Sequence, residues 1–101
     1  MSLITFFEDD GVAKEKQRRI CVSLWAYIYE KHPRDARVSD AKFDATCKEI
    51  DLSIKTGNDL LDNFFEKEFG PETGQWIHRH PELYKLENLY RRLLRDDTLP
   101  G

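Results

Sequence analysis

The sequence is poor in the residues and motifs on which most enzyme chemistry depends. Its 101 residues include only two cysteines, Cys21 and Cys47, and three histidines. It has no Cys-x-x-Cys pair, no Gly-rich phosphate loop and no nucleophile beside a base. Two cysteines are too few for a disulfide scaffold, and we interpret both as reduced thiols of the core. We therefore expect no catalytic residue and a protein that is not a self-contained enzyme.

Long apolar runs and an excess of positive charge are also missing. No apolar stretch approaches the roughly 20 residues that cross a bilayer, so we expect a cytoplasmic protein with no membrane partner. The net charge of -3 argues against general nucleic-acid binding, because phosphate neutralisation requires an excess of Lys and Arg. The basic residues at 14–19 would allow a local basic face, but we interpret them as solvated helix surface.

What the sequence does contain is helical periodicity. Apolar residues recur at three- and four-residue steps in four segments, which is the spacing of one helix face. The segments are 12–31, ended by Pro33; 39–50, with Ser39 as N-cap; 58–69, with Asn58 as N-cap; and 81–95, with Pro81 in its first position. The residues expected to face inward are Ile20, Cys21, Leu24, Trp25 and Ile28; Phe43, Cys47 and Ile50; Leu61, Phe65 and Phe69; and Leu83, Leu86, Leu89, Tyr90, Leu93 and Leu94.

These segments predict an all-α fold. We expect residues 1–101 to form a single helical domain, a small bundle of about four helices built on an antiparallel hairpin of the first two. Residues 71–80 should form an ordered loop or a brief extended piece that is anchored by Trp76. The two ends, residues 1–11 and 96–101, should fray.

The junction of the first two helices carries a recognisable pattern. The first expected helix ends in the sequence Tyr-Ile-Tyr-Glu (27–30), a short loop with Pro33 follows, and the second helix opens with Ser-Asp-Ala-Lys-Phe-Asp (39–44). This pattern resembles the N-terminal helical hairpin of bacterial NAD-dependent DNA ligases, where a Tyr-His pair ends the first helix and Asp-x-x-Tyr-Asp opens the second. Glu30 stands where the family has His, and Phe43 stands where it has Tyr.

The resemblance implies a site for the nicotinamide mononucleotide half of NAD. The residues that it assigns to this site are Tyr29, Glu30, Asp40, Phe43 and Asp44. Their chemistry agrees with such a ligand, because an aromatic ring stacks on a cationic nicotinamide and carboxylates four residues apart share one helix face. The alternative is that Ser39, Asp40 and Phe43 serve only as N-cap, dipole-matched acid and first core residue of a helix.

A second group of chemically dense residues precedes the last helix. Trp76, His78, Arg79 and His80 combine aromatic, imidazole and basic groups, a mixture typical of a recognition surface for another protein. His78 and His80 would also share one side of an extended segment, as two metal ligands would. We favour a role for His80 as a cap of the last helix, with His78 near Trp76, and expect no metal site.

Two functions follow from these patterns. The first is a non-catalytic accessory or binding module that resembles the ligase hairpin, acts in nucleic-acid metabolism and binds NAD or nicotinamide mononucleotide. The alternative is a small interaction or inhibitor protein of the kind that phages and mobile elements encode, with another protein as its partner. Leu86 and Leu93, seven residues apart, are compatible with a homodimer as well as with the intramolecular core.

Overall fold

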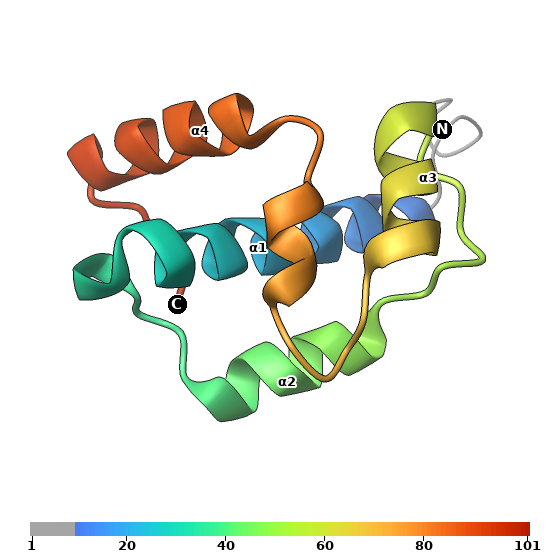
Figure 1. Ribbon diagram of the computed structural model, residues 1–101, viewed down its shortest axis with the longest axis horizontal. Coiled ribbons are helices and arrows are strands. Elements are labelled where there is room, and N and C mark those ends of the chain that lie inside the picture. The colour runs from blue at the N-terminus through green and yellow to red at the C-terminus, as the bar shows by residue number, and fades with distance from the viewer. Residues whose placement is uncertain (1–9) are drawn as a thin grey trace, which may run out of the picture.

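The computed structural model describes residues 10–101, which fold into four α-helices and two short 3-10 helices (Figure 1). The elements are α1 (Asp10–Lys31), η2 (Pro33–Asp35), α2 (Asp40–Glu49), α3 (Asp59–Glu68), η3 (Gln75–Arg79) and α4 (Leu83–Arg95). No β-strand occurs in this part of the chain, so the all-α prediction is confirmed. None of its helices is long and apolar enough to cross a membrane. The predicted fraying of residues 1–11 falls mostly outside the described residues, and residues 10 and 11 belong to α1.

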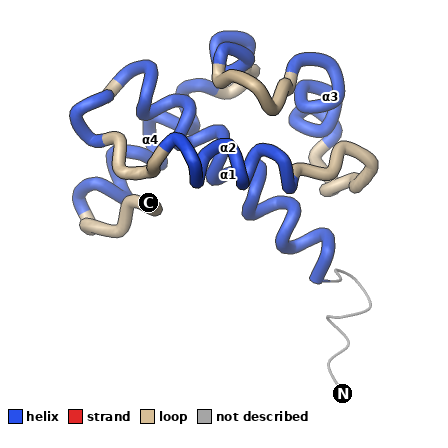
Figure 2. The backbone as a smooth tube through the Cα atoms, turned by 90° about the horizontal axis from the view of Figure 1, so that it is seen from below, coloured by secondary structure: helices blue, strands red, loops and turns tan. Residues whose placement is uncertain are grey.

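Helix α1 is the axis of the bundle. It contacts α2, η2, η3 and α4, and Figure 1 shows α2 running back along one side while α4 covers the other. Seen from below in Figure 2, the N-terminal turns of α1 extend beyond the other helices. The antiparallel pair of α1 and α2 is the predicted hairpin, and the remaining helices close around its first member.

The central position of α1 changes which of its residues are buried. The sequence predicted one apolar face that includes Ile20, but Ile20 is 47% exposed, whereas seven successive residues, 22–28, are all buried. A single buried stripe belongs to a helix that packs on one side only. Because α1 is covered from several sides, its middle is buried all round, and Ser23 and Tyr27 become core residues.

The helix starts follow the predicted capping chemistry in two cases out of three. The side chain of Ser39 accepts a hydrogen bond from the backbone N–H of Lys42, and that of Asn58 accepts one from the N–H of Leu61. The last helix begins at Leu83 rather than at Pro81. The ring nitrogen Nδ1 of His80 accepts a hydrogen bond from the N–H of Glu82 at 3.0 Å, which satisfies a donor at the helix start and leaves Pro81 in a preceding turn.

Residues 71–80 contain a short helix and not an extended piece. The N–H groups of Ile77 and His80 bond the carbonyls three residues earlier, which is the pattern of the 3-10 helix η3. Trp76 anchors this segment as predicted, since it is 3% exposed and its ring packs against Phe64, Phe65 and Phe69. The indole N–H of Trp76 finds no hydrogen-bond acceptor among the described residues. We infer that the packing of the ring against three aromatic neighbours offsets the free-energy cost of this buried, unpaired donor.

The C-terminal segment 96–101 packs on the bundle, which corrects the prediction that it frays. Leu99 is buried in a cluster with Leu24, Ile28 and Tyr90. Asp97 adopts a left-handed conformation (φ 56°) that turns the chain back after α4, and the Trp25 indole N–H donates to the carbonyl of Pro100 at 3.1 Å. The segment lacks helical periodicity, but it supplies one apolar side chain and one acceptor to the core.

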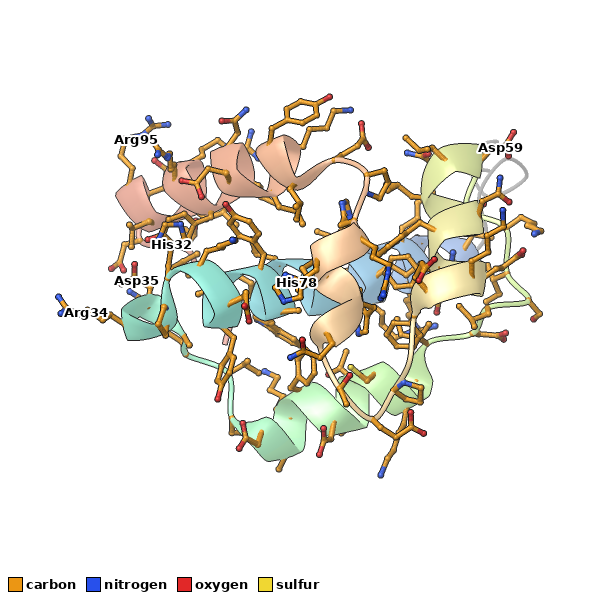
Figure 3. The ribbon with its side chains drawn as sticks, in the orientation of Figure 1. His32, Arg34, Asp35, Asp59, His78 and Arg95 are labelled. Atoms are coloured by element: carbon orange, nitrogen blue, oxygen red, sulfur yellow. The ribbon has the colours of Figure 1, made fainter. Side chains whose placement is uncertain are left out.

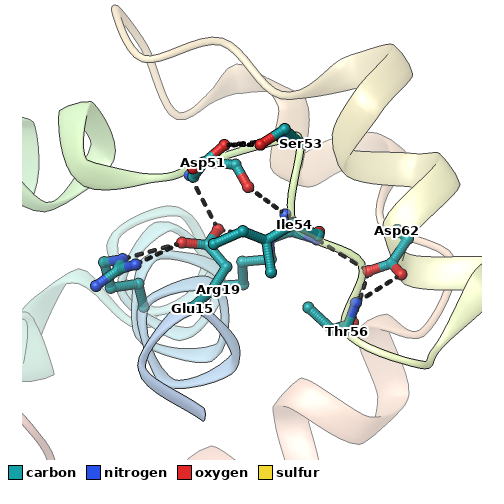
Figure 4. A network of polar contacts seen from close by, with 8 residues as sticks. Glu15, Arg19, Asp51, Ser53, Ile54, Thr56 and Asp62 are labelled. Atoms are coloured by element: carbon teal, nitrogen blue, oxygen red, sulfur yellow. Dashed lines mark hydrogen bonds and ion pairs between the residues drawn. The ribbon is translucent and has the colours of Figure 1, made fainter. Parts of the chain in front are cut away.

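A buried ionic network holds the loop between α2 and α3 against α1 (Figure 4). The Arg19 guanidinium lies 2.7 Å from a Glu15 carboxylate oxygen and 2.9 Å from one of Asp62, and all three side chains are almost fully buried. Arg19 also donates to the carbonyls of Asp51 and Ile54 at 2.8 and 3.0 Å. Burial alone would raise the pKa of Asp62, but hydrogen bonds from Thr56 and the charge of Arg19 hold this pKa below its usual value.

Candidate functional site

One cavity brings together all five residues that the resemblance assigned to a nucleotide site. This cavity of about 350 Å³, the hairpin pocket, lies where the end of α1 meets the start of α2. Its lining consists of Trp25, Ala26, Tyr29, Glu30, Val38, Asp40, Phe43, Asp44, Glu72, Gly74 and Gln75. The five predicted residues therefore share one pocket, which a helix start alone would not require.

The geometry of the two helices explains why these residues meet. Trp25, Ala26 and Tyr29 are three and four residues apart, so they lie along one side of the last turns of α1. Asp40 and Asp44 are one turn apart at the start of α2. Because α2 runs back along α1, its first turns lie beside the last turns of α1.

The pocket has an apolar floor and an aromatic rim. Trp25 and Ala26 are buried, Phe43 is partly buried, and Tyr29 is 67% exposed. The loop before η3 packs against this floor, since a Cβ on Gly74 would lie 3.5 Å from the Cβ of Ala26, an ordinary contact. An exposed ring beside a closed apolar floor gives a flat ligand a surface to stack on.

The charge of the pocket lining is entirely negative. Glu30, Asp40, Asp44 and Glu72 are all exposed carboxylates, and no Lys or Arg is among the lining residues. His78 of η3 lies over α1 (Figure 3), where its Nε2 is 3.3 Å from a carboxylate oxygen of Glu30. An acidic, aromatic pocket of this kind favours a ligand that carries positive charge.

Lys42 is the basic residue of α2 that comes near this lining. Its ammonium group lies 5.8 Å from the centre of the Trp25 ring and donates to the carbonyl of Gly101 at 3.0 Å. Trp25 is thus held by Lys42 and by the carbonyl of Pro100, and the last residues of the chain support the floor of the pocket.

The second predicted surface, Trp76 to His80, is not a single surface. Trp76 and His80 are buried in the core, and only His78 and Arg79 are exposed. His80 packs edge-on against Phe64, and burial lowers its pKa, which favours the neutral ring that accepts from Glu82. The surface was expected from an extended or looped segment, but the 3-10 helix has about three residues per turn. It therefore turns Trp76, Ile77 and His80 inward and leaves only His78 and Arg79 outside.

Sequence reasoning missed several lining residues of the hairpin pocket. Glu72 and Gln75 lie in a segment without periodicity, far along the chain from the hairpin, and only the fold brings them there. Trp25 was expected in the core, where it is, but its edge also lines the pocket. The one local signal is that Glu72 stands between Gly70 and Gly74, in a segment whose glycines and proline predict a loop.

A second cavity, the apolar groove, was not predicted at all. It measures about 500 Å³ and opens between α1, α3 and α4. Its apolar lining consists of Ile20, Leu61, Phe65, Leu86 and Leu89, and its polar lining of Lys16, Arg19, Ser23, Thr56, Gly57, Asn58, Asp62, His80, Glu82 and Lys85. The exposed side chain of Ile20 belongs to this groove.

A cluster of polar side chains joins the end of α1 to α4 on the far side from α2 (Figure 3). Tyr27 donates its hydroxyl to Glu87, His32 Nε2 lies 2.8 Å from the same carboxylate, and the His32 ring stacks on Tyr90 at 4.0 Å. Burial, followed by the bond to Glu87, raises the pKa of Tyr27 to about 12; the hydrogen bonds from Tyr27, Arg91 and His32 lower the pKa of Glu87 to about 2. Neither group exchanges a proton readily near neutral pH, so we interpret the cluster as structural.

The described residues 10–101 contain no group of three or more His, Cys, Asp and Glu side chains arranged to hold a metal ion. Within this range His78 pairs with Glu30 while His80 is buried against Phe64, so the two rings serve separate contacts. No protein-family model, curated protein or solved structure matches the chain.

Proposed function

We propose that the protein is a non-catalytic binding module whose hairpin pocket binds the nicotinamide half of NAD. One observation carries this proposal: Tyr29, Glu30, Asp40, Phe43 and Asp44, singled out by the ligase-like pattern, all line one pocket. The resemblance to the ligase hairpin supports an accessory role in nucleic-acid metabolism, without ligase activity of its own.

The chemistry of the pocket supports a ligand of this kind. Tyr29 and Phe43 offer rings for stacking on the pyridinium, and the carboxylates of Asp40 and Asp44 can neutralise its charge or accept hydrogen bonds from ribose hydroxyls. A cavity of about 350 Å³ lies within the range of small-molecule sites. The two departures from the ligase pattern replace an imidazole by the Glu30 carboxylate and remove the hydroxyl at Phe43, so the site is more acidic than that pattern prescribes.

Calorimetric titration with nicotinamide mononucleotide and with NAD tests this function. We expect saturable heat, and a loss of at least tenfold in affinity in Tyr29→Ala, because this change removes an aromatic ring that lines the pocket. Tyr84→Ala is a matched control, since Tyr84 is also exposed but lies on α4 outside the pocket. Absence of heat at millimolar concentrations of both ligands, and of the same nucleoside without its phosphate, would contradict the proposal.

The apolar groove favours a second candidate, a protein that binds another protein. Ile20, which is 47% exposed, and the partly buried Leu89 offer apolar surface that a side chain of a partner could cover. Co-purification from a lysate tests this function, with Ile20→Ser expected to release the partner. Leu60→Ser is the control, because Leu60 is 54% exposed but does not line the groove. Equal retention of the partner by both variants would argue against the groove, and light scattering of the purified protein would show whether the partner is a second copy.

A further inference from the structure

We propose that the hairpin pocket selects a cationic nucleoside over its phosphorylated form. The ligand class is a pyridinium that carries a ribose without a phosphate, as in nicotinamide riboside. This inference rests on the proposed function and concerns the part of the ligand that the pocket accepts. It follows from the charges that line and surround the pocket.

The lining of the hairpin pocket carries negative charge that no lining residue balances. Four carboxylates, those of Glu30, Asp40, Asp44 and Glu72, face a cavity of about 350 Å³ without a lysine or arginine among the lining residues. Of the four carboxylates only Glu30 has an ion-pair partner among the described residues, His78. Asp40, Asp44 and Glu72 pair with no basic side chain in this part of the chain. A phosphate group placed in or at this pocket meets like charges, which disfavour it.

The pocket lining lacks the side chains that usually bind a phosphate group. Phosphate sites use Arg, Lys or the free N–H groups of a helix N-terminus. The start of α2 borders the pocket, but Ser39 already accepts from the N–H of Lys42, and Asp40 places a negative charge in the first turn. The ammonium group of Lys42 is held by the carbonyl of Gly101 and is not part of the lining.

The pyridinium ring and the ribose of the ligand both find suitable groups in the pocket. Rings of Trp25, Tyr29 and Phe43 beside carboxylates favour a flat cation, by stacking and by charge. Ribose hydroxyls donate hydrogen bonds that carboxylates accept. The pocket therefore attracts the pyridinium and the sugar of the ligand and repels its phosphate.

The test compares the affinities of nicotinamide riboside and nicotinamide mononucleotide by calorimetry at 20 mM and 500 mM salt. We expect the riboside to bind at least tenfold more tightly at low salt, and we expect the ratio to shrink at high salt because the carboxylates are exposed and ions screen them. Equal or tighter binding of the mononucleotide would overturn this inference and leave the proposed function standing. If neither compound binds, both fail.

A pair of double variants identifies the source of the preference. In Asp44→Asn with Glu72→Gln, two pocket carboxylates become neutral amides of the same shape, and we expect the riboside preference to fall at least threefold. The control is Glu49→Gln with Asp59→Asn, which removes the same charge from exposed positions outside the pocket. A preference that falls equally in both variants would contradict a local origin and assign it to the net charge of the protein.

Discussion

At the scale of single residues, the charge of Arg19 links four residues from three parts of the chain. Its guanidinium balances two buried carboxylates, those of Glu15 and Asp62, and donates to two backbone carbonyls of the loop that precedes α3. It also lies 5.4 Å from the centre of the Phe65 ring. Sequence reasoning assigned the basic cluster at 14–19 to solvated surface, and Arg19 departs from this because periodicity does not show where a partner helix will cover a polar residue.

Replacement of Arg19 by Met should destabilise the protein severely. The variant keeps the apolar length of the side chain but leaves buried Asp62 without its ion-pair partner and Glu15 with only the partly exposed Arg18. Loss of one partner of a buried pair costs about 3–5 kcal/mol in comparable cases. Urea unfolding measures the loss in free energy of unfolding.

Arg18→Met is the matched control for this experiment. Arg18 also pairs with Glu15, at 2.9 Å, but its side chain is partly exposed, and such pairs contribute about 1 kcal/mol or less. If the two variants lost similar stability, the buried network would not be the main contribution of Arg19.

At the scale of elements, helices were more predictable than the connections between them. The starts at Ser39 and Asn58 could be located because a capping side chain acts on its own helix within three residues. The form of residues 75–79 could not, because it depends on Phe64 and Phe65 of α3 and on Phe69 just after that helix, which surround Trp76. Burial of residues 22–28 of α1 also depends on the rest of the fold, because α2, η2, η3 and α4 all contact this helix.

The attachment of α4 to the end of α1 should depend on pH through Glu87. The pKa of Glu87 is about 2 in the folded protein and near 4.5 without its partners, so its contribution to stability is complete above about pH 4.5. It is lost as the pH falls from about 4.5 towards 2. We expect a contribution of about 2 kcal/mol, below the full value for such a shift because solvent reaches this carboxylate.

Glu87→Gln tests this dependence. Urea midpoints measured between pH 7 and pH 2 should show the variant less stable at pH 7, with a difference that shrinks towards zero near pH 2. Glu49→Gln, at an exposed position of α2, should follow the unmodified protein throughout. A constant difference across the range would show that Glu87 acts through packing and not through its charge.

At the scale of the whole molecule, the two ends of the described residues pack differently. The first turns of α1 extend beyond the other helices, whereas the C-terminal segment packs against them. Residues 96–101 return to the bundle and place Leu99 beside Leu24, Ile28 and Tyr90. The sequence did not predict this, because a single apolar residue among polar ones carries no periodic signal. The hairpin pocket shows the converse: a local pattern located five lining residues, whereas Glu72 and Gln75, some 30 residues further along the chain, required the fold.

Leu99→Ala should lower the free energy of unfolding by about 2–3 kcal/mol, the lower part of the range for truncation of a buried leucine, since Leu99 belongs to a small cluster at the edge of the bundle. Leu94→Ala is the control, because Leu94 is 37% exposed and its truncation should cost less than about 1 kcal/mol. Thermal or urea unfolding of both variants measures the difference. Similar losses would mean that the C-terminal segment contributes little to the core.

The positions of the two tryptophans give the protein separate optical reporters. Trp25 borders the hairpin pocket, whereas Trp76 is enclosed by Phe64, Phe65 and Phe69. A flat ligand stacked in the pocket would change the emission of Trp25 alone, and unfolding would change both. A Trp25→Phe variant would therefore be blind to binding while its remaining fluorescence still followed unfolding, so occupancy and stability can be read from one sample.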